Sequence, residues 1–247
     1  MKKNKNGFTL TEVLITLSIL GVVAAISIPN MIQNYKKRVT VTKIQKAYAQ
    51  INQMASNIAI NSGCMGQTVQ CSGLLDFNDT ANNQNFAKKF IELSGLKAKI
   101  IGTNRADVYP MYCENVADKC ANNHDINVYT RIQTDDGLIY TLRNTVSSRD
   151  VITDKGALSI GVITEKNKRW VAGKNAFFFI IYNNFIVEPV MTGYTSKGAG
   201  AIPMSKTTSG AIDYYCNPKD TGSVSPKYGS GTSCAAKIIK DGWKITY

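Results

Sequence analysis

The chain has 247 residues, of which 44% are hydrophobic and 19% charged, a composition typical of a folded globular protein rather than a disordered one. Twenty-nine Lys and Arg against 17 Asp and Glu give a net charge of +12, which favours anionic partners without identifying one. The single histidine, His124, excludes His-based catalytic triads and multi-histidine metal sites. We therefore expect one globular domain with appendages and no ordinary hydrolase chemistry.

A long apolar segment follows a basic start. Residues 1–7, MKKNKNG, hold three lysines and no acid, and no residue from Val13 to Ile28 is charged. A helix over residues 8–32, with a rise of about 1.5 Å per residue, spans roughly 37 Å and covers a bilayer core of about 30 Å. Because cytoplasmic flanks are rich in Lys and Arg, the sequence predicts a single-pass helix with its N-terminus in the cytoplasm.

A cleavable secretory signal peptide is the alternative interpretation, since residues 24–27 offer small side chains near the end of the apolar run. Two features oppose it. Cleavage there would cut one continuous helix, because apolar residues recur at steps of three and four well past Pro29, at Ile44, Tyr48, Ile51, Ala55 and Ile58. Glu12 also lies inside the apolar segment, at a cost in hydrocarbon on the order of 3 kcal/mol that some partner must compensate.

The spacing of Gly7, Phe8, Glu12 and Pro29 resembles the N-terminal motif of the type IV pilin and type II secretion pseudopilin family. The resemblance implies that a membrane prepilin peptidase removes residues 1–7 by cleaving after Gly7, and that the new N-terminal Phe8 is N-methylated. It places the family's membrane-embedded acidic residue at Glu12. It places the proline at which the helix kinks or melts at Pro29. The implied partners are other pilin subunits, the peptidase and methyltransferase, and an inner-membrane assembly platform with its ATPase.

The chemistry of Glu12 fits an assembly role. Cleavage before Phe8 creates a positively charged α-amino group about one helical turn from Glu12, at the inner end of an apolar helix. In a low-dielectric filament core, pairing of that amino group with Glu12 of a neighbouring subunit would favour an axial offset and a helical filament. The alternative is that Glu12 only extends to the lipid headgroups near the start of the helix.

Two helical segments are expected beyond the membrane. Residues 33–60 continue the first helix, with an apolar stripe for a globular domain and with Lys43 and Lys46 on the polar face. A second helix is expected from about Ala81 to Ser94, ended by Gly95. Its inward residues are Phe86, Ala87, Phe90, Ile91 and Leu93.

From about residue 97 the apolar period changes towards two, which indicates strands. Residues 126–134 and 138–143 are expected to form a hairpin around Asp135-Asp136-Gly137. Residues 193–233, rich in Gly, Ser, Thr and Pro, indicate long surface loops, and residues 240–247 a turn with a final short strand. Further strands are expected at 157–164, 176–183 and 184–190.

The predicted fold class is α+β and pilin-like, with a long N-terminal transmembrane helix packed on a C-terminal antiparallel sheet domain that has disulfide-closed loops. The expected organisation is a leader at 1–7, a transmembrane and filament-core helix at 8–32, an amphipathic continuation at 33–60, and a periplasmic or extracellular domain at 61–247.

The six cysteines form no CxxC pair, and with one histidine they cannot build a zinc site at the usual spacing. Six cysteines permit fifteen pairings, and the short separations favour sequential bridges. An even number beside an export signal indicates an oxidising compartment, although some could instead be free, buried apolar residues. The expected pairs are Cys64 with Cys71, Cys113 with Cys120, and Cys216 with Cys234.

These features predict a non-catalytic structural subunit of a type II secretion pseudopilus or a type IV pilus. It would reside in the bacterial inner membrane with its C-terminal domain periplasmic, and then in a filament in the periplasm or at the cell surface. No cofactor or metal is expected. Asp213, Asp220 and Asp241 do not by themselves form a calcium loop, and three of the four charged residues in 164–172 are basic.

Two other functions are compatible with the sequence. A DNA-binding competence-type minor pilin would use the cluster of Lys166, Lys168, Arg169 and Trp170 to bind phosphates and stack on bases, although a charge run is more often a solvated turn. An exported enzyme with a retained anchor is the third reading, but no nucleophile, base and orienting group stand out.

Overall fold

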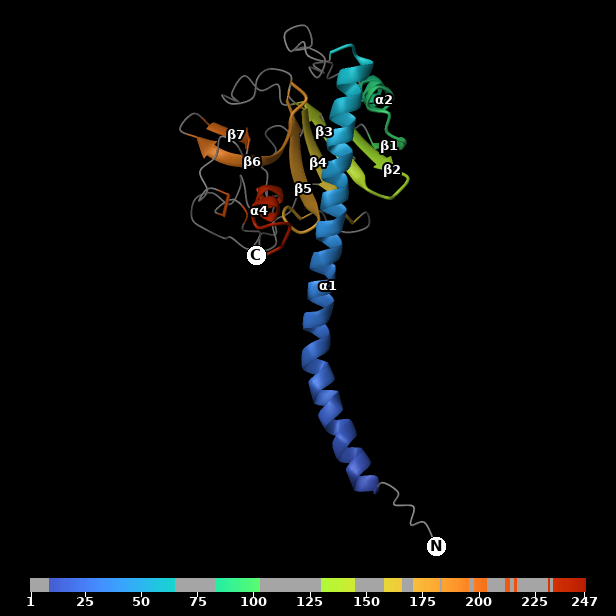
Figure 1. Ribbon diagram of the computed structural model, residues 1–247, viewed down its shortest axis with the longest axis vertical. Helices are drawn as coiled ribbons and strands as arrows, with labels where there is room; N and C mark the ends of the chain where they lie inside the picture. The colour runs from blue at the N-terminus through green and yellow to red at the C-terminus, as the bar shows by residue number, and fades with distance from the viewer. Residues whose placement is uncertain are drawn as a thin grey trace. The chain divides into compact units, whose positions relative to one another are not determined.

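The computed structural model describes residues 9–64, 83–102, 130–144, 158–165, 171–182, 184–195, 198–203, 212–213, 216, 231 and 233–247. The chain divides into two compact units, Met1–Val39 and Thr40–Tyr247. The first unit holds the N-terminal part of a long helix. The second holds the remainder of that helix with a sheet and two shorter helices (Figure 1).

Helix α1 spans Leu10–Asn61 and confirms the prediction of one long N-terminal helix. It runs through Pro29 without interruption, so local melting, one of the two outcomes expected there, does not occur. Proline has no N–H to donate to the carbonyl of Ala25, yet α1 continues on both sides of Pro29. The sequence therefore encodes a single helix of 52 residues.

The sheet is antiparallel throughout and its seven strands follow each other in chain order. This confirms the α+β prediction, including the hairpin that turns at residues 135–137, where Gly137 has φ +85°. The strands are β1 Ala98–Gly102, β2 Thr130–Thr134, β3 Ile139–Asn144, β4 Leu158–Ile163, β5 Ala176–Ile181, β6 Val187–Thr195 and β7 Gly198–Pro203.

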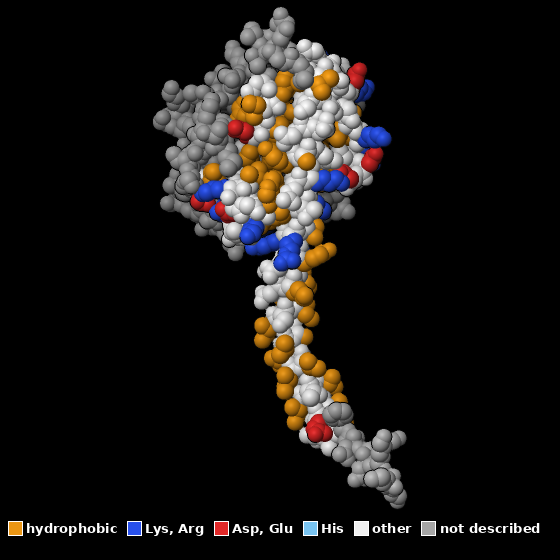
Figure 2. All heavy atoms as spheres, viewed as in Figure 1, with side chains coloured by type: hydrophobic (Ala, Val, Ile, Leu, Met, Phe, Trp, Pro, Cys, Tyr) orange, Lys and Arg blue, Asp and Glu red, His pale blue; other side chains and the backbone are white. Residues whose placement is uncertain are grey.

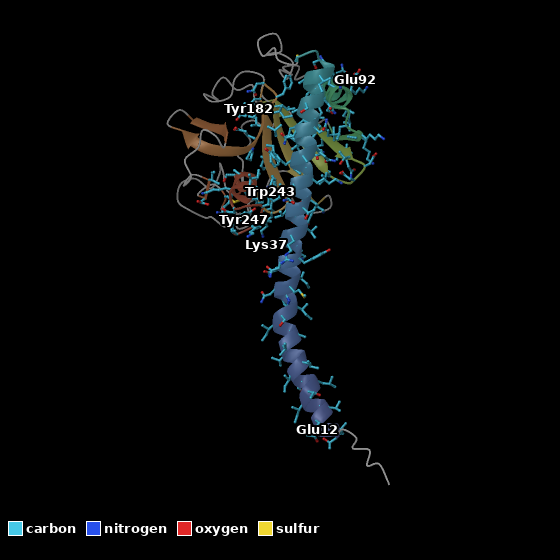
Figure 3. All side chains as sticks on the ribbon, viewed as in Figure 1. Glu12, Lys37, Glu92, Tyr182, Trp243 and Tyr247 are labelled. Carbon is cyan, nitrogen blue, oxygen red and sulfur yellow. A yellow bond between two sulfur atoms is a disulfide. The ribbon has the colours of Figure 1, made fainter. Side chains whose placement is uncertain are left out.

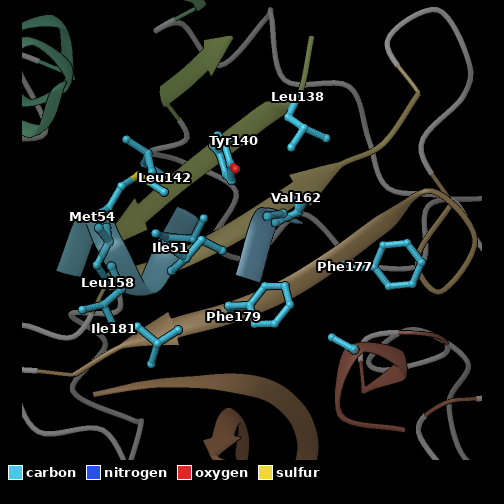
Figure 4. Close-up of a cluster of buried hydrophobic side chains, with 14 of the residues drawn as sticks. Ile51, Met54, Leu138, Tyr140, Leu142, Leu158, Val162, Phe177, Phe179 and Ile181 are labelled. Atoms are coloured by element: carbon cyan, nitrogen blue, oxygen red, sulfur yellow. The ribbon is translucent and has the colours of Figure 1, made fainter. Parts of the chain in front are cut away.

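The core of the second unit lies between α1 and one face of the sheet (Figure 4). The predicted stripe on α1 is confirmed, since Ile44, Ile51, Ala55 and Ile58 are all buried. They meet side chains of β3, β4 and β5, among them Tyr140, Leu142, Leu158, Phe179 and Ile181. Burying one such aliphatic side chain contributes roughly 1.5 to 3 kcal/mol, so this stripe fixes α1 to the sheet.

Helix α2 spans Asn83–Ser94 and adds a smaller contribution to the same core. Phe86, Ala87 and Phe90 are buried as predicted, and the two rings lie 6.2 Å apart in an edge-on arrangement. Gly95 follows the helix with φ +64°, a backbone angle that glycine adopts without steric cost. Residues 81 and 82, where the prediction starts the helix, lie outside the described residues.

The expectation of loops throughout residues 193–233 is wrong at its start. Strand β6 continues to Thr195, and β7 pairs with it over the full length from Val190–Pro203 to Thr195–Gly198. The sequence GAGAIP of β7 lacks the apolar–polar alternation by which strands are recognised and contains one branched residue, Ile202. Backbone pairing to β6 selects the extended form there, and the side-chain pattern does not reveal it.

The predicted C-terminal strand is also wrong, because the segment ends in a helix and its cap. Helix α4 spans Cys234–Lys240, and residues 244–247 carry no strand. Gly242, at φ +69°, donates its N–H to the carbonyl of Ile239, and Trp243 donates to that of Ile238 at 2.7 Å. These two bonds define a Schellman motif. Asp241-Gly242 therefore ends a helix, whereas the prediction took this segment as a turn before a final short strand.

The C-terminal segment is held tightly against the connection that precedes β5. Cys216 and Cys234 form the predicted disulfide, with Cα atoms 4.5 Å apart. A Cβ atom on Gly173 would lie 2.7 Å from Sγ of Cys234, so the sulfur needs a glycine beside it. The Tyr247 hydroxyl donates to the Gly173 carbonyl at 2.7 Å, and the Trp243 ring lies 5.9 Å from that of Tyr48 on α1.

Polar contacts join α1 to the sheet at the edge of the core. The amine of Lys46 lies 2.8 Å from the carboxylate of Asp136, which also accepts from Gln50, and the hydroxyl of Tyr140 donates to Gln50. Lys43 donates to the carbonyl of Thr164 at 2.8 Å. Lys43 and Lys46, which were predicted on the polar face of the helix, also reach the sheet, and Lys46 stays exposed while doing so.

Asp136 makes the stability of this contact depend on pH. Burial acts to raise the pKa of Asp136, but hydrogen bonds from Lys46, Thr134, the Leu138 amide and Gln50 outweigh it and lower the pKa to about 2. A carboxylate with a lowered folded-state pKa stabilises the fold above its unfolded pKa, and this contribution is lost as pH falls through the folded value. The loss therefore falls between about pH 4 and pH 2.

We expect Asp136→Asn to lower the free energy of unfolding at pH 7 by up to about 1 kcal/mol, the range of partly exposed ion pairs. The difference from wild type should vanish near pH 2. Thermal unfolding of the full chain in detergent across this pH range measures it. Asp135→Asn, on the neighbouring exposed turn residue, is the control, and equal effects of the two variants would contradict the role of Asp136.

Gly231 tests how closely the C-terminal segment approaches Ala172. A Cβ atom on Gly231 would lie 2.2 Å from the carbonyl oxygen of Ala172, whereas one on Gly137 would meet nothing within 4 Å, although both glycines have φ +85°. Gly231→Ala should therefore destabilise the fold by about 1 to 3 kcal/mol more than Gly137→Ala. Thermal or denaturant unfolding of the two variants makes the comparison, and equal losses would show that only backbone strain is involved.

Candidate functional site: the N-terminal helix segment

The first half of α1 is apolar on all sides. Its large hydrophobic side chains are exposed from Leu10, at 78%, to Met31, at 75%. Figure 2 shows hydrophobic side chains along the visible face of this helix. Among the described residues, α1 is the one helix long and apolar enough to cross a membrane.

Glu12 closes the start of this helix through a reciprocal capping box. The backbone N–H of Thr9 and its hydroxyl both donate to Oε2 of Glu12 at 2.8 Å, and the N–H of Glu12 donates to Oγ1 of Thr9 at 3.3 Å. Thr9 is the N-cap residue and Glu12 occupies the third helical position, where an acceptor satisfies N–H groups that the first turn leaves open. Figure 3 shows Glu12 at the helix start.

The capping box gives the Glu12 carboxylate a partner within its own subunit. It also places negative charge at the helix N-terminus, which the helix dipole stabilises. The sequence analysis missed this arrangement, although the signal, Thr followed three residues later by Glu before an apolar run, is present in Thr9-Leu10-Thr11-Glu12. The roles predicted for Glu12 were a contact with a neighbouring subunit or extension to the lipid headgroups, and not a helix cap.

The structure describes some of the other predicted site residues and not others. Gly7 and Phe8 lie outside the described residues, and Pro29 lies inside α1. Cys216 and Cys234 are bonded to each other, and Cys64 is disulfide-bonded. Cys71, Cys113 and Cys120 lie outside the described residues, so the pairs Cys64 with Cys71 and Cys113 with Cys120 stay predictions.

The acidic residues near the C-terminus make ion pairs. Asp213 lies 2.6 Å from the amine of Lys237 and 3.3 Å from that of Lys240, and Lys237 also reaches Asp241 at 3.0 Å. The hydrogen bond from Lys237, with that from Lys240, lowers the pKa of Asp213. Within the described ranges no group of three His, Cys, Asp or Glu could hold a metal ion. Asp220 and the basic cluster at residues 166–170 lie outside those ranges.

Comparison with known protein families identifies the N-terminal segment. Residues 2–28 match the family model described as the prokaryotic N-terminal methylation motif. This is the prepilin-type signature of type IV pilins and pseudopilins, and it confirms the resemblance drawn at Gly7, Phe8 and Glu12, whereas Pro29 lies one residue beyond the match. No curated protein and no solved structure matches the chain.

The motif and the helix together indicate a general class. The N-terminal methylation motif supports a protein of the type IV pilin or pseudopilin family, and it points to a structural subunit. The apolar helix and the motif fit anchoring in the inner membrane. Assembly with other pilin subunits and processing by prepilin peptidase follow from the motif.

Thr9 should control the order of the first helical turn. Thr9→Val removes the hydroxyl that accepts from the Glu12 N–H, whereas Thr9→Ser keeps it. An N-cap is worth about 1 kcal/mol, so exchange of the Glu12 amide should be about fivefold faster in Thr9→Val than in Thr9→Ser. NMR hydrogen exchange on the full chain in micelles provides the measurement, and the same rate in both variants would mean that the cap does not form.

Proposed function

We propose that this protein is a structural subunit of a type II secretion pseudopilus or a type IV pilus, made as a precursor and inserted once in the bacterial inner membrane. The observation that carries the proposal is the methylation motif over residues 2–28, which leads directly into an apolar helix whose side chains are exposed. A helix apolar all around suits either lipid or a bundle of like helices. A filament subunit needs both environments in succession.

In this proposal prepilin peptidase cleaves between Gly7 and Phe8 and the new N-terminus is methylated. Helix 8–32 then leaves the membrane to form the filament core, with the domain at 61–247 outside. Disulfides form in an oxidising compartment, which the bonded states of Cys64, Cys216 and Cys234 support.

Intact-mass analysis of the protein from its native host tests the processing step. We expect a mass that lacks residues 1–7 and carries one methyl group on Phe8. Gly7→Val should leave the precursor uncleaved in the membrane, because a side chain there prevents close approach of the peptidase to the backbone. A mature N-terminus near Ile28 would instead indicate ordinary signal-peptide cleavage.

The role of Glu12 in assembly requires a change of partner. Within the chain its carboxylate accepts from Thr9, and cleavage would create an α-amino group one residue before Thr9. In a filament, the amino group of a neighbouring subunit would become the stronger partner, because opposite charges in a low-dielectric core attract more than a neutral amide and a carboxylate do. The proposed assembly contact is thus Glu12 to the N-terminus of another copy.

Glu12→Gln separates the assembly role from the capping role. Glutamine can keep the capping box but carries no charge. If the carboxylate pairs with a neighbour's amino group, Glu12→Gln and Glu12→Ala should both be inserted and cleaved, and both should fail to enter filaments. Breaking a buried pair of this kind costs about 3 to 5 kcal/mol.

A sheared-filament assay beside a membrane-fraction blot measures the outcome. Thr9→Ser, which keeps both hydroxyl and charge, is the matched control and should assemble normally. Filaments formed by Glu12→Gln but not by Glu12→Ala would show that capping alone is required. Partial incorporation of both variants would indicate a subunit at the filament tip, which has one neighbour fewer.

A further inference from the structure

Three consecutive basic residues, Lys36, Lys37 and Arg38, follow the apolar part of α1. They end a stretch from Val13 to Tyr35 that contains no charged residue. All three are exposed on the described helix, and Lys37 is labelled in Figure 3. We refer to these three residues as the basic collar.

The collar has no acidic residue near it in sequence. After Glu12 the next acid in the chain is Asp76, so the helix from Val13 to Asn61 contains basic residues but no acid. Ion pairs between helix positions three or four apart, which commonly neutralise exposed lysines, are therefore impossible here. The helix itself supplies no negative charge to the collar.

The geometry of the collar suits a plane rather than a groove. Consecutive helical residues turn by about 100° and rise about 1.5 Å, so the three side chains spread over about 200° within about 3 Å along the axis. A protein partner that packs along one side of a helix would be met by charges three or four residues apart. A layer of phosphates perpendicular to the helix axis would instead meet charges that lie at nearly the same level along that axis, and the three collar residues are spaced in this way.

The polarity of the preceding residues follows that of a membrane interface. Exposed Ile32 is followed by the neutral polar Gln33 and Asn34, then by Tyr35, which is 68% exposed, and then by the collar. Tyrosine is enriched at the headgroup level, and long basic side chains extend from there towards water and phosphate. The order from apolar to aromatic to cationic matches the exit of a helix from a bilayer.

Membrane orientation does not account for this charge. Lys and Arg that orient a helix lie on the cytoplasmic flank, where the leader already supplies Lys2, Lys3 and Lys5. The collar lies at the opposite end of the span. In the proposed processing the leader lysines are removed, so the mature helix would keep its cluster of positive charge at the outer end only.

We infer that the basic collar binds the phosphate groups of anionic lipids in the leaflet from which the helix emerges. The inference rests on the proposed membrane insertion of α1. Its consequence is that the collar sets the depth of the subunit in the bilayer before assembly. Extraction of the helix into a filament must then break these lipid contacts.

The test uses the full chain in nanodiscs that contain equal amounts of phosphatidylglycerol and phosphatidylcholine. Lipids retained after release are counted by native mass spectrometry for wild type, for Lys36→Gln/Lys37→Gln/Arg38→Gln, and for the control Lys88→Gln/Lys89→Gln/Lys97→Gln. The control removes three charges from exposed lysines of the second unit. One basic residue near an anionic surface is worth about fivefold in affinity.

We expect wild type and control to retain phosphatidylglycerol in preference to phosphatidylcholine. In the collar variant this preference should be at least about fivefold smaller. Added salt should weaken the preference of wild type. Equal retention of the two lipids by wild type, or equal loss in both variants, would overturn the inference while leaving the proposed function intact. Failure of wild type to enter the discs would overturn both. Cross-linking between subunits is measured on the same variants. If the collar variant keeps its lipid retention but loses these cross-links, the partner of the collar is a protein, and the inference is overturned.

Discussion

The structure depends on one helix that meets two different surroundings along its length. From Leu10 to Met31 the large apolar side chains of α1 are exposed on all sides, whereas from Val41 onwards only one stripe is apolar and that stripe is buried. Exposed apolar area of this extent is unfavourable in water by about 25 cal/mol per Å², so the first half requires lipid or other helices around it. The second half already has its partner in the sheet. Because helix formation is cooperative, the apolar first half and the half packed on the sheet form one continuous helix.

Much of this arrangement could be predicted because it follows from side-chain periodicity. Residues Ile44, Tyr48, Ile51, Ala55 and Ile58 repeat at steps of three and four, and their burial, partial for Tyr48, confirms the pattern. Strands β2 to β5 were found because they are rich in branched and aromatic residues and one pair encloses an Asp-Gly turn. Where burial of apolar side chains determines the structure, the spacing of those side chains in the sequence predicts it.

The incorrect predictions lie where backbone hydrogen bonds decide the outcome. Strand β7 is built largely from glycine and alanine, and its extended form depends on pairing with β6, which no local pattern encodes. Asp241-Gly242 is compatible with a hairpin or with a helix end, and the helix preceding it decides between them through the bonds to Ile238 and Ile239. A glycine in the sequence indicates where a positive φ is permitted, but it does not indicate which element ends there.

Glu12 shows how a local structural role and an assembly role can occupy one residue. A carboxylate in an apolar helix needs donors at every stage, and an unpaired one in hydrocarbon is costly. In the isolated chain the backbone N–H and the hydroxyl of Thr9 are these donors. These groups lie at the same helix end as the proposed new N-terminus, so a partner's amino group could replace them without moving the carboxylate along the helix. In the proposed assembly, the capping box would supply the carboxylate with donors from its own subunit until a neighbour's amino group replaces them, so that one charge would be compatible with both insertion and assembly.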